Sequence, residues 1–364
     1  MNWIISGLAV VLGMSLIWRI SYIKRTTSEK RRNAVSVIIP ARNEEKNIEQ
    51  LLQSLLPQWS DALEIIVMDD HSDDRTAEVA NYYGARVISV PDLPDGWLGK
   101  SWACWNGALA AQGEQLLFLD ADIIVDEGGL QKLLNAYSTE KGWLSVQPYH
   151  RVEKWYEYGS AFFNLITMIS MRPKFMPNGE SSMGAFGQCL LCSKSAYFYY
   201  GGHNIIKQEI VENMALGQHV VRHGGKIRCI SGKGTISMRM YPGGLRTLVN
   251  GWAKSFASGA AATNPYDLLL ISTWITGSMT IAIKLFQASG EGLYVLLALY
   301  GLLFLQFRWS LSKLGSFGWI TAFLFPVHIL FFTIVFTYSL FCTTILKKVS
   351  WKGRDIAVKG GKDS

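Results

Sequence analysis

The sequence predicts an α/β domain with a mainly parallel sheet, flanked at both ends by apolar segments that are long enough to enter a membrane. From about residue 33 to residue 235, short runs rich in β-branched residues alternate with amphipathic stretches, which is typical of repeated strand-helix units. Outside that range the chain is strongly apolar. Of its 364 residues, 49% are hydrophobic and 13 are tryptophan, more than a soluble domain usually carries.

The expected strands and helices of the central domain follow one another in a regular order. Residues 34–40 (AVSVIIP) form a first buried strand, and residues 44–56 carry apolar positions at helical spacing. A strand over 64–68 and a helix over 75–83 follow, with Gly84 as the stop signal. Further strands are expected over 86–90 and 116–119. Polar residues follow these strands, and open α/β sheets bind ligands at such carboxyl ends.

The first apolar segment, residues 3–18, contains no charged residue and is predicted to be an uncleaved membrane anchor. Positive charge follows it, whereas a cleaved signal peptide carries its positive charge before the apolar run. By the positive-inside rule the next residues are then cytoplasmic. A buried core helix is the alternative interpretation. The basic residues are Arg19, Lys24, Arg25, Lys30, Arg31 and Arg32.

Three more apolar stretches, 268–286, 293–307 and 317–346, are each a candidate span. The third contains Pro326, which is expected to tilt or kink it or to make it re-enter. The tail after it is basic (Lys347, Lys348, Lys352, Arg354) and prefers the cytoplasm. A cytoplasmic central domain then requires an even number of crossings. Three candidates give an odd number, so either one stretch only lies in the membrane or the charge rule fails.

Charge and cysteine content narrow the class of partner. The net charge of +7 and pI of about 9.0 would suit nucleic acid, an anionic lipid surface or phosphate ligands. Many basic residues flank the apolar segments, where membrane topology accounts for them, so no nucleic-acid partner is expected. The five cysteines are scattered and odd in number, which suits a reducing cytosolic side. Cys189 and Cys192 are expected to be ordinary buried thiols.

The strand over 116–119 runs directly into Asp120-Ala121-Asp122. Two carboxylates two positions apart at a strand end point the same way, and placing like charges together is costly without a cation between them. A hard divalent ion, Mg²⁺ or Mn²⁺, would offset the repulsion and could bridge a diphosphate. The alternative is a solvated turn. The buried LLFL strand before the pair favours the metal site.

Two other strand ends carry polar residues. After the strand over 64–68 come Asp69-Asp70-His71-Ser72-Asp73-Asp74, where Asp73 or Asp74 is expected to cap the next helix. Asp69 or Asp70 is then free to accept a hydrogen bond, such as the N–H of a uracil. The first strand ends in Pro40-Ala41-Arg42-Asn43-Glu44, where Asn43 could be a cap and Arg42 could lie against a base or pair with phosphate.

Residues 95–108 (DGWLGKSWACWNGA) open with glycines and Lys100 and continue as a predicted helix. Backbone N–H groups at a helix start, together with one lysine, suit a diphosphate. The segment lacks the spacing of a P-loop and of a GxGxxG fingerprint, so an NTPase or a dehydrogenase is disfavoured. Taken alone, Lys100 is more simply a solvated lysine.

In this order and spacing, the runs VSVIIPARNEE, EIIVMDDHSDDRT, GWLGKSWACWNGA and LFLDADI resemble an inverting family-2 glycosyltransferase of GT-A fold, a nucleotide-diphospho-sugar transferase fold with a Rossmann-like mixed sheet. More narrowly, LSVQPYH, AFG, GGH, ENMALG and the region of residues 238–260 are similar to glycosyltransferases of bacterial carotenoid synthesis. The resemblance covers nearly the whole chain, including the apolar ends. The membrane-synthase motif QxxRW is not intact, and residues 250–254 (NGWAK) take its place on an expected interfacial helix.

The resemblance implies roles for individual residues. Asp70 would contact the uracil, and Lys100 would lie near the donor. The family base usually sits in a Glu-Asp pair that opens a helix. Here that pair is Glu212-Asn213, so we expect Glu212 to be the base, with Glu209 as the alternative, or both to be surface acids. The remaining implied contacts are Pro40, Arg42 and Glu44 around the nucleotide, Asp120 at the ribose and metal, and Asp122 at the metal and diphosphate.

The resemblance further implies inverting transfer of glucose from UDP-glucose, with Mg²⁺ or Mn²⁺, to the carboxylate of a C30 carotenoid acid. The product would be a glycosyl ester. A carboxylic acid with a pKa of roughly 4 is already ionised near neutral pH and needs no base. We hypothesise that Asn213 is tolerated for that reason. The alternatives are another lipid acceptor (diacylglycerol, sphingoid or polyprenyl phosphate) and an inactive sugar-nucleotide-binding scaffold.

This interpretation divides the chain into parts and predicts its surroundings. We expect a cytoplasmic catalytic domain on a multi-pass cell-membrane protein, with membrane lipid and other carotenoid-pathway enzymes as partners. The parts are an anchor and basic stop (residues 1–32), a GT-A catalytic domain (33–235), an interfacial segment on the acceptor side (236–264), C-terminal transmembrane segments (265–346) and a basic tail (347–364).

Overall fold

The computed structural model describes residues 3–18, 20–23, 34–60, 63–138, 142–171, 182–209, 212–261, 265–344, 348–351 and 354–357. The chain divides into two compact units. The helical unit comprises Met1–Ile20, His150–Lys174 and Arg239–Ser364, and the sheet unit comprises Ser21–Tyr149 and Phe175–Met238. Several basic residues expected to set the topology lie outside the described residues: Arg19, Lys24, Arg25, Lys30, Arg31, Arg32, Lys347 and Lys352.

The sheet unit is built on a seven-stranded sheet of order β3-β2-β1-β4-β8-β6-β9. Four strands run parallel in its first half: β3 (Arg86–Ser89), β2 (Leu63–Asp69), β1 (Val35–Ala41) and β4 (Gln115–Leu119). Strand β8 (Cys189–Ser193) is antiparallel to β4 and to β6 (Trp143–Gln147), and β9 (Ile227–Ser231) is parallel to β6. The four expected strands are confirmed, and the sheet is mixed.

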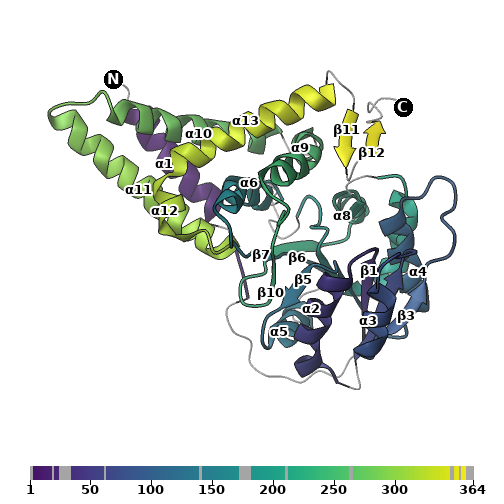
Figure 1. Cartoon of the computed structure of the whole chain (residues 1–364). Coiled ribbons are helices and arrows are strands. Elements are labelled where there is room, and N and C mark those ends of the chain that lie inside the picture. Colours follow the sequence, from purple (N-terminus) through teal and green to yellow (C-terminus); the bar gives the residue numbers. More distant parts are fainter. Residues whose placement is uncertain are drawn as a thin grey trace. The chain divides into compact units, whose positions relative to one another are not determined.

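Helices accompany this sheet in the order that the sequence predicts (Figure 1). Helix α2 (Glu45–Leu55) buries Ile48, Leu51, Leu52 and Leu55, the apolar positions of its sequence period. Helix α4 comes unusually close to the sheet, because a Cβ on its Gly107 would lie 2.4 Å from Cγ2 of Ile38. The other helices and turns are α3 (Thr76–Tyr82), α5 (Gly129–Ser138), α7 (Lys194–Tyr199), α8 (Glu212–Arg222), η1 (Leu56–Gln58) and η3 (Gly202–Ile206), and α4 spans Gly99–Ala110.

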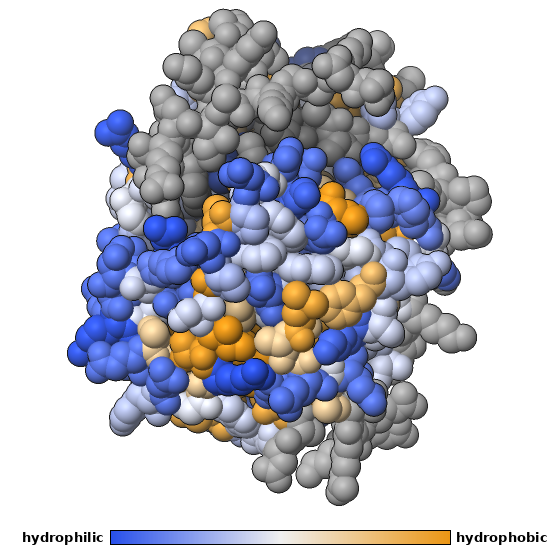
Figure 2. All heavy atoms as spheres, turned by 90° about the vertical axis from the view of Figure 1, so that its right-hand side faces the viewer, coloured by the Kyte–Doolittle hydropathy of each residue, from blue (hydrophilic) through white to orange (hydrophobic). Residues whose placement is uncertain are grey.

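Smaller features complete the sheet unit. Strands β5 (Ile123–Val125) and β10 (Ile236–Met238) pair antiparallel, and β7 (Tyr149–His150) lies where the chain passes between the units. Cys189 and Cys192 are buried free thiols on β8, as expected. Figure 2 shows a face on which hydrophilic residues predominate and apolar residues form smaller patches.

The helical unit contains three helices that are long and apolar enough to cross a membrane: Pro265–Leu285 (α10), Glu291–Leu314 (α11) and Phe325–Cys342 within α13. Helix α1 (Trp3–Ile17) is also apolar, but its apolar part, Ser6–Ile17, is shorter than these three helices. The third predicted stretch is not one helix. It is divided into α12 (Gly318–Phe323) and α13 (Phe325–Thr344), with Pro326 in the first turn of α13, where a missing N–H leaves no helical hydrogen bond unmade. The unit also contains η2 (Trp155–Ser160), α6 (Ala161–Ser170), α9 (Leu245–Ala261) and the hairpin β11 (Lys348–Trp351) with β12 (Arg354–Ala357).

Helix α1 packs against α10 and α11 through small residues. A Cβ on Gly277 of α10 would lie 2.3 Å from that of Ala9, and a Cβ on Gly13 would lie 2.2 Å from Nε1 of Trp274. Nε2 of Gln306 on α11 donates to the carbonyl of Val10 at 2.6 Å. Close backbone approach at small residues and polar contacts between helices are typical of membrane bundles.

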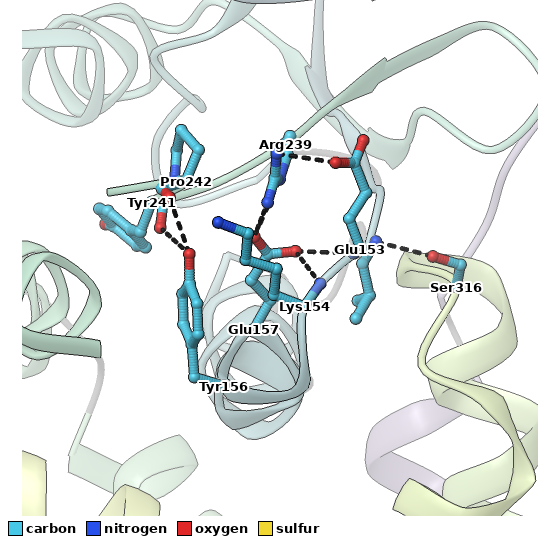
Figure 3. A network of polar contacts seen from close by, with 9 residues as sticks. Glu153, Lys154, Tyr156, Glu157, Arg239, Tyr241, Pro242 and Ser316 are labelled. Carbon is cyan, nitrogen blue, oxygen red and sulfur yellow. Dashed lines mark hydrogen bonds and ion pairs between the residues drawn. The ribbon is translucent and has the colours of Figure 1, made fainter. Parts of the chain in front are cut away.

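An ion-pair network surrounds the buried Glu157 in η2 (Figure 3). The carboxylate of Glu157 is fully buried and accepts from the backbone N–H of Glu153 and of Lys154, at 2.7 and 3.1 Å. Nε of Arg239 donates to it at 2.8 Å, and a second guanidinium nitrogen pairs with Glu153 at 2.7 Å. Burial opposes the charge of Glu157, but these hydrogen bonds hold its pKa below the ordinary value.

Candidate active site

The carboxyl ends of β1, β2 and β4 meet at one edge of the sheet. Because Ala41 is in register with Asp69 and the strands are parallel, Arg42 and Asp70 follow side by side, and Nη1 of Arg42 lies 3.6 Å from Oδ2 of Asp70. Helix α4 starts against this pair, since a Cβ on Gly99 would lie 2.9 Å from Oδ2 of Asp70. The sequence-predicted residues of two strand ends are therefore brought together.

The loops after β1 and β2 are tied to each other by side chains. Asn43 has φ of 55°, and its side-chain oxygen accepts from the backbone N–H of Asp73 at 2.8 Å. Its own N–H donates to Oγ of Ser72 at 3.0 Å. Asn43 is thus a link between loops and not the helix cap that was the simpler interpretation. The N-cap of α3 is Arg75, so the prediction of Asp73 or Asp74 at that position is wrong, although Asp74 accepts from the N–H of Thr76, the first residue of α3, at 2.9 Å.

Lys100, in the first turn of α4, is the central cation of the site. Its Nζ lies 2.7 Å from Oδ1 of Asp120, 3.1 Å from Oε1 of Glu212 and 3.4 Å from the carbonyl oxygen of Gly187. Burial alone would lower the pKa of this ammonium, but the carboxylates of Asp120 and Glu212 raise it well above the ordinary value. The lysine is therefore charged and paired with two carboxylates.

Asp122 completes the acidic pair and has an oxygen without a partner. Oδ1 of Asp122 is buried and accepts no hydrogen bond from the described residues. Burial and then the neighbouring charge of Asp120 raise the pKa of Asp122 to about 7. An unpartnered buried carboxylate oxygen beside a second carboxylate fits a hard divalent cation. No group of three or more His, Cys, Asp or Glu side chains suited to a metal occurs among the described residues, so an ion here would need further ligands from a substrate or water.

Glu212 and Asn213 open helix α8, where the sequence resemblance implies an acidic pair. Burial opposes the charge of Glu212, but Lys100 holds its pKa below the ordinary value, so it is a carboxylate. The Asn213 side chain donates to the carbonyl of Gly187 at 3.2 Å and lies 3.5 Å from Oε1 of Glu212. Glu209 is exposed and precedes α8, so of the two candidate bases Glu212 is the one placed beside Lys100.

Two groups near the site were not singled out by the sequence. His203, within the GGH run, is fully buried. The hydroxyl of Tyr197 accepts from the His203 backbone N–H at 3.1 Å and lies 2.7 Å from its Nδ1. Burial lowers the pKa of His203 to about 4, so the ring is neutral. The other group is the carbonyl of Gly187, which the sequence indicated only as the last residue of the AFG run.

The remaining predicted residues lie on the same strand ends. Pro40 is the penultimate residue of β1, and the side chain of Glu44 accepts from Nδ2 of Asn47 at 2.5 Å. The charge of Glu44 also contributes to the raised pKa of Asp122. Asp69, at the end of β2, is buried with one unpartnered oxygen, Oδ1. Of the two acids that could contact the uracil, Asp69 is thus buried and Asp70 is paired with Arg42.

Comparison with known proteins identifies the family. Residues 36–211 match the model of glycosyl transferase family 2. The chain is 35% identical over 375 residues to the 4,4'-diaponeurosporenoate glycosyltransferase of Staphylococcus aureus strain USA300, covering 98% of this chain and 99% of that one. The enzyme of strain MRSA252 is also 35% identical, over 376 residues.

Among solved structures, the chain is similar to mannosyltransferase PcManGT from Pyrobaculum calidifontis, solved in complex with GDP-Man and Mn²⁺. The TM-score is 0.51 at 16% identity, over 89% of this chain and 99% of that one. At this identity the match shows the fold alone, and it confirms the GT-A architecture. The chain belongs to glycosyl transferase family 2 and is a glycosyltransferase related over its full length to the 4,4'-diaponeurosporenoate glycosyltransferases.

Proposed function

We propose that this glycosyltransferase moves glucose from UDP-glucose, with inversion and with a divalent metal, to the carboxylate of a C30 carotenoid acid such as 4,4'-diaponeurosporenoate. The observation that carries the proposal is the charge arrangement at the end of β4. Lys100 pairs with Asp120 and Glu212 while Asp122 keeps a buried free oxygen. The full-length similarity to carotenoid glycosyltransferases supports the acceptor.

The donor would lie across the carboxyl ends of β1, β2 and β4. Asp70 and Arg42 lie 3.6 Å apart and suit a uracil. The carboxylate of Asp70 would accept from its N–H, and the guanidinium of Arg42 would stack against its ring. The first turn of α4 offers backbone N–H groups and Lys100 to the diphosphate. Pro40 and Glu44 would border the nucleotide from the β1 loop.

Asp120 and Asp122 would hold Mg²⁺ or Mn²⁺. The ion supplies charge that stabilises the leaving nucleoside diphosphate. Lys100 adds a second positive charge near the same group, and it can do so by moving from the carboxylates to the diphosphate when the ion arrives. The acceptor oxygen forms its bond to the anomeric carbon from the opposite face, and the bond to the diphosphate oxygen breaks with its electron pair on UDP.

Glu212 has two possible tasks, and the acceptor decides between them. A hydroxyl acceptor must lose a proton, and Glu212, a carboxylate at the start of α8, would take it. A carotenoid carboxylate brings no proton, because an acid with a pKa of roughly 4 is ionised near neutral pH. We propose the second case. Glu212 then positions Lys100 and shapes the site electrostatically.

We also propose that the helical unit anchors the enzyme in the cell membrane with the sheet unit on the cytoplasmic side. Three helices with the length and composition of spans support the membrane location. The basic residues that follow α1 and α13 in the sequence support the orientation through the positive-inside rule. A cytoplasmic sheet unit has direct access to a nucleotide sugar, and the apolar unit to a hydrophobic acceptor.

The decisive experiment is a product analysis. Purified full-length protein in detergent or lipid is incubated with UDP-glucose, UDP-galactose or GDP-mannose and with a C30 carotenoid acid, with and without Mn²⁺, and the products are identified by mass. We expect a hexosyl ester from UDP-glucose that requires the metal and is cleaved by mild alkali. A glycoside of diacylglycerol, a sphingoid base or polyprenyl phosphate in place of the ester would overturn the acceptor assignment. No transfer from any donor would overturn the proposed activity and favour a binding scaffold.

A further inference from the structure

The third apolar stretch of the C-terminal region is unusual because its two helices return toward the end at which they start. Helix α11 ends at Leu314, where the backbone N–H of Ser316 donates to the carbonyl of His150 at 2.9 Å. The backbone N–H of Val152 donates to Oγ of Ser316 at 2.8 Å. His150 follows the sheet-unit residue Tyr149. The start of the α12 segment is therefore fixed at the end of the bundle where the chain enters the sheet unit.

The directions of the other helices agree with this placement. Nζ of Lys313 donates to the carbonyl of Ile20 at 2.7 Å, and Ile20 precedes the sheet-unit residue Ser21. Helices α1 and α11 thus finish at the same end. Helix α10 runs the other way, since Gly277 approaches Ala9 and Trp274, earlier in α10, approaches Gly13. The loop between α10 and α11 lies at the opposite end of the bundle, away from α9 (Figure 1).

Helix α12 then travels only part of the way along α11. The hydroxyl of Tyr300 donates to the carbonyl of Phe323, the last residue of α12, at 2.6 Å. The ring of Phe325, at the start of α13, lies 4.8 Å from the rings of both Tyr300 and Phe307. At 1.5 Å per residue, Tyr300 is about 21 Å from the Leu314 end of α11 and about 14 Å from its other end. A hydrocarbon core is about 30 Å thick, so a turn at this point of α11 would lie near the middle of a core that α11 spans.

Helix α13 leads back from this turn. The ring of Phe332 lies 5.0 Å from that of Phe163 on α6 and 5.5 Å from that of Phe256 on α9. Further along, Phe336 contacts Phe256, and the hydroxyl of Ser339 donates to the carbonyl of Ala253. Helix α9 follows Arg239, which is joined to Glu157 of η2 at the sheet-unit end. Along α13, contacts therefore pass from Tyr300 of α11, near the turn, to Phe256 and Ala253 of α9.

The surface of this hairpin suits hydrocarbon. Between Leu314 and Leu346 the sequence contains no Asp, Glu, Lys or Arg. Most of its exposed side chains are large and apolar, and a contiguous apolar surface of this kind is typical of a membrane or partner contact. They include Trp319, Ile320, Phe323, Val327, Leu330 and Ile334.

We infer that α12 and α13 form a re-entrant hairpin that lies in one leaflet of the bilayer and does not cross it. The chain then crosses three times, with α1, α10 and α11, and both the sheet unit and the basic tail lie on the same side. Irregular backbone at the turn is tolerated at this depth because Tyr300 satisfies the carbonyl of Phe323. The inference removes the conflict between three apolar stretches and a basic tail. It rests on the proposed membrane location, and it is independent of the proposed chemistry.

The test uses single cysteines and a membrane-impermeant thiol reagent on full-length protein in sealed vesicles of both orientations. The parent carries Cys342→Ser, since the other four cysteines are buried. Four variants are added to it: Ser60→Cys as a marker of the sheet unit, Ser289→Cys in the α10–α11 loop, Leu324→Cys at the turn and Ser364→Cys in the tail. Ser60, Ser289 and Leu324 are exposed on the protein, and activity of each variant confirms that it is folded.

We expect Ser364→Cys to react from the same side as Ser60→Cys, and Ser289→Cys to react only from the other side. Leu324→Cys should react from neither side until detergent is added. Labelling of the tail from the side of Ser289→Cys, or of Leu324→Cys from the side of Ser60→Cys, would show that α13 crosses and would overturn the inference. Release of the protein by alkaline carbonate, with all four sites reactive, would overturn the membrane location as well. The glycosyl-transfer assay tests the chemistry separately.

Discussion

Replacement of Glu212 by Gln tests how the acceptor becomes a nucleophile. Glutamine keeps the length of the side chain and can still accept from Lys100, but it removes one negative charge at 3.1 Å from Nζ. Lys100 keeps its shorter contact with Asp120, at 2.7 Å. Two unit charges 4 Å apart interact by about 4 kcal/mol at an effective dielectric constant of about 20. Partial exposure of both side chains, 34% for Lys100 and 16% for Glu212, reduces this, and we expect a stability loss of about 1 kcal/mol.

The expected rate depends on the acceptor. If the acceptor is a carboxylate, no proton is removed, and the rate of Glu212→Gln should stay within about tenfold of the parent. If Glu212 is a general base for a hydroxyl, the loss should be roughly 100-fold to 10,000-fold, which is about 3–5 kcal/mol of activation free energy. The two cases are therefore well separated.

The assay measures initial rates of UDP release and of ester formation with saturating UDP-glucose and C30 carotenoid acid. Glu209→Gln is the matched control, because it makes the same chemical change at an exposed position outside α8. A loss of more than about 100-fold in Glu212→Gln, with Glu209→Gln unchanged and both proteins folded, would refute our reasoning. A large loss in Glu209→Gln alone would move the base to that residue.

Three further predictions follow from distances and charges. Gly99→Ala should raise the KM for UDP-glucose several-fold with little change in kcat, because the added Cβ would lie 2.9 Å from Oδ2 of Asp70. The control Gly7→Ala, with open space around the residue, should change neither constant. An unchanged KM in Gly99→Ala would contradict the contact between Asp70 and the uracil. The affinity of the donor-free protein for Mn²⁺ should fall below about pH 7, by up to about tenfold per pH unit. The reason is that Asp122, with a pKa of about 7, then carries a proton that the ion must displace. Equal affinities at pH 6 and pH 8 by calorimetry would contradict this prediction. Glu157→Gln should lower the free energy of unfolding at pH 7 by roughly 2 kcal/mol, because hydrogen bonds from Arg239 lower the pKa of Glu157 in the folded protein. This stabilisation is present above the unfolded pKa of about 4.3 and is lost as the pH falls through the lower folded pKa. A melting temperature equal to that of the parent at pH 7 would contradict the prediction.

The surroundings of Asn213 add a loss of stability to the expected effect of Asn213→Asp. From the sequence, Asn213→Asp should have little effect on the rate. In the structure, Nδ2 of Asn213 donates to the Gly187 carbonyl at 3.2 Å and lies near Glu212. An aspartate cannot make that bond and would place a buried acid beside another. We still expect little change in rate per folded molecule, but a lower melting temperature; a faster reaction in this variant would contradict the carboxylate-acceptor proposal.

Local patterns predicted much of the fold and of the site. The strand at 116–119 and the carboxylates after it could be read from a buried run followed by acids, because a strand end exposes what comes next. The same reasoning placed Arg42 and Asp70 together. Lys100 was also named, but its true partners, Asp120 and Glu212, are 20 and 112 positions away along the chain. Their meeting depends on how β4, α4 and α8 pack, which no local pattern contains.

The sequence could not resolve the last apolar stretch for the same physical reason. Hydropathy describes residues 317–346 as continuous, and Pro326 is compatible with a tilt, a kink or a re-entry. The deciding contacts are those of Phe323 with Tyr300 and of Ser339 with Ala253. These contacts are long-range, and composition does not encode them. Asn43 is a similar case on a smaller scale, since its partner Asp73 lies 30 residues away.

The contact between Val10 and Gln306 has a consequence for biosynthesis. These residues are 296 positions apart, yet the side chain of one donates to the backbone of the other. At a translation rate of about 5–20 residues per second, roughly 15–60 s separate the emergence of the two from the ribosome. For most of that time, while the sheet unit is being synthesised, α1 lacks both helical neighbours, because α10 begins only at Pro265. In the proposed membrane location, the first helix must therefore remain inserted without α10 and α11, and the bundle can close only after α11 has been synthesised.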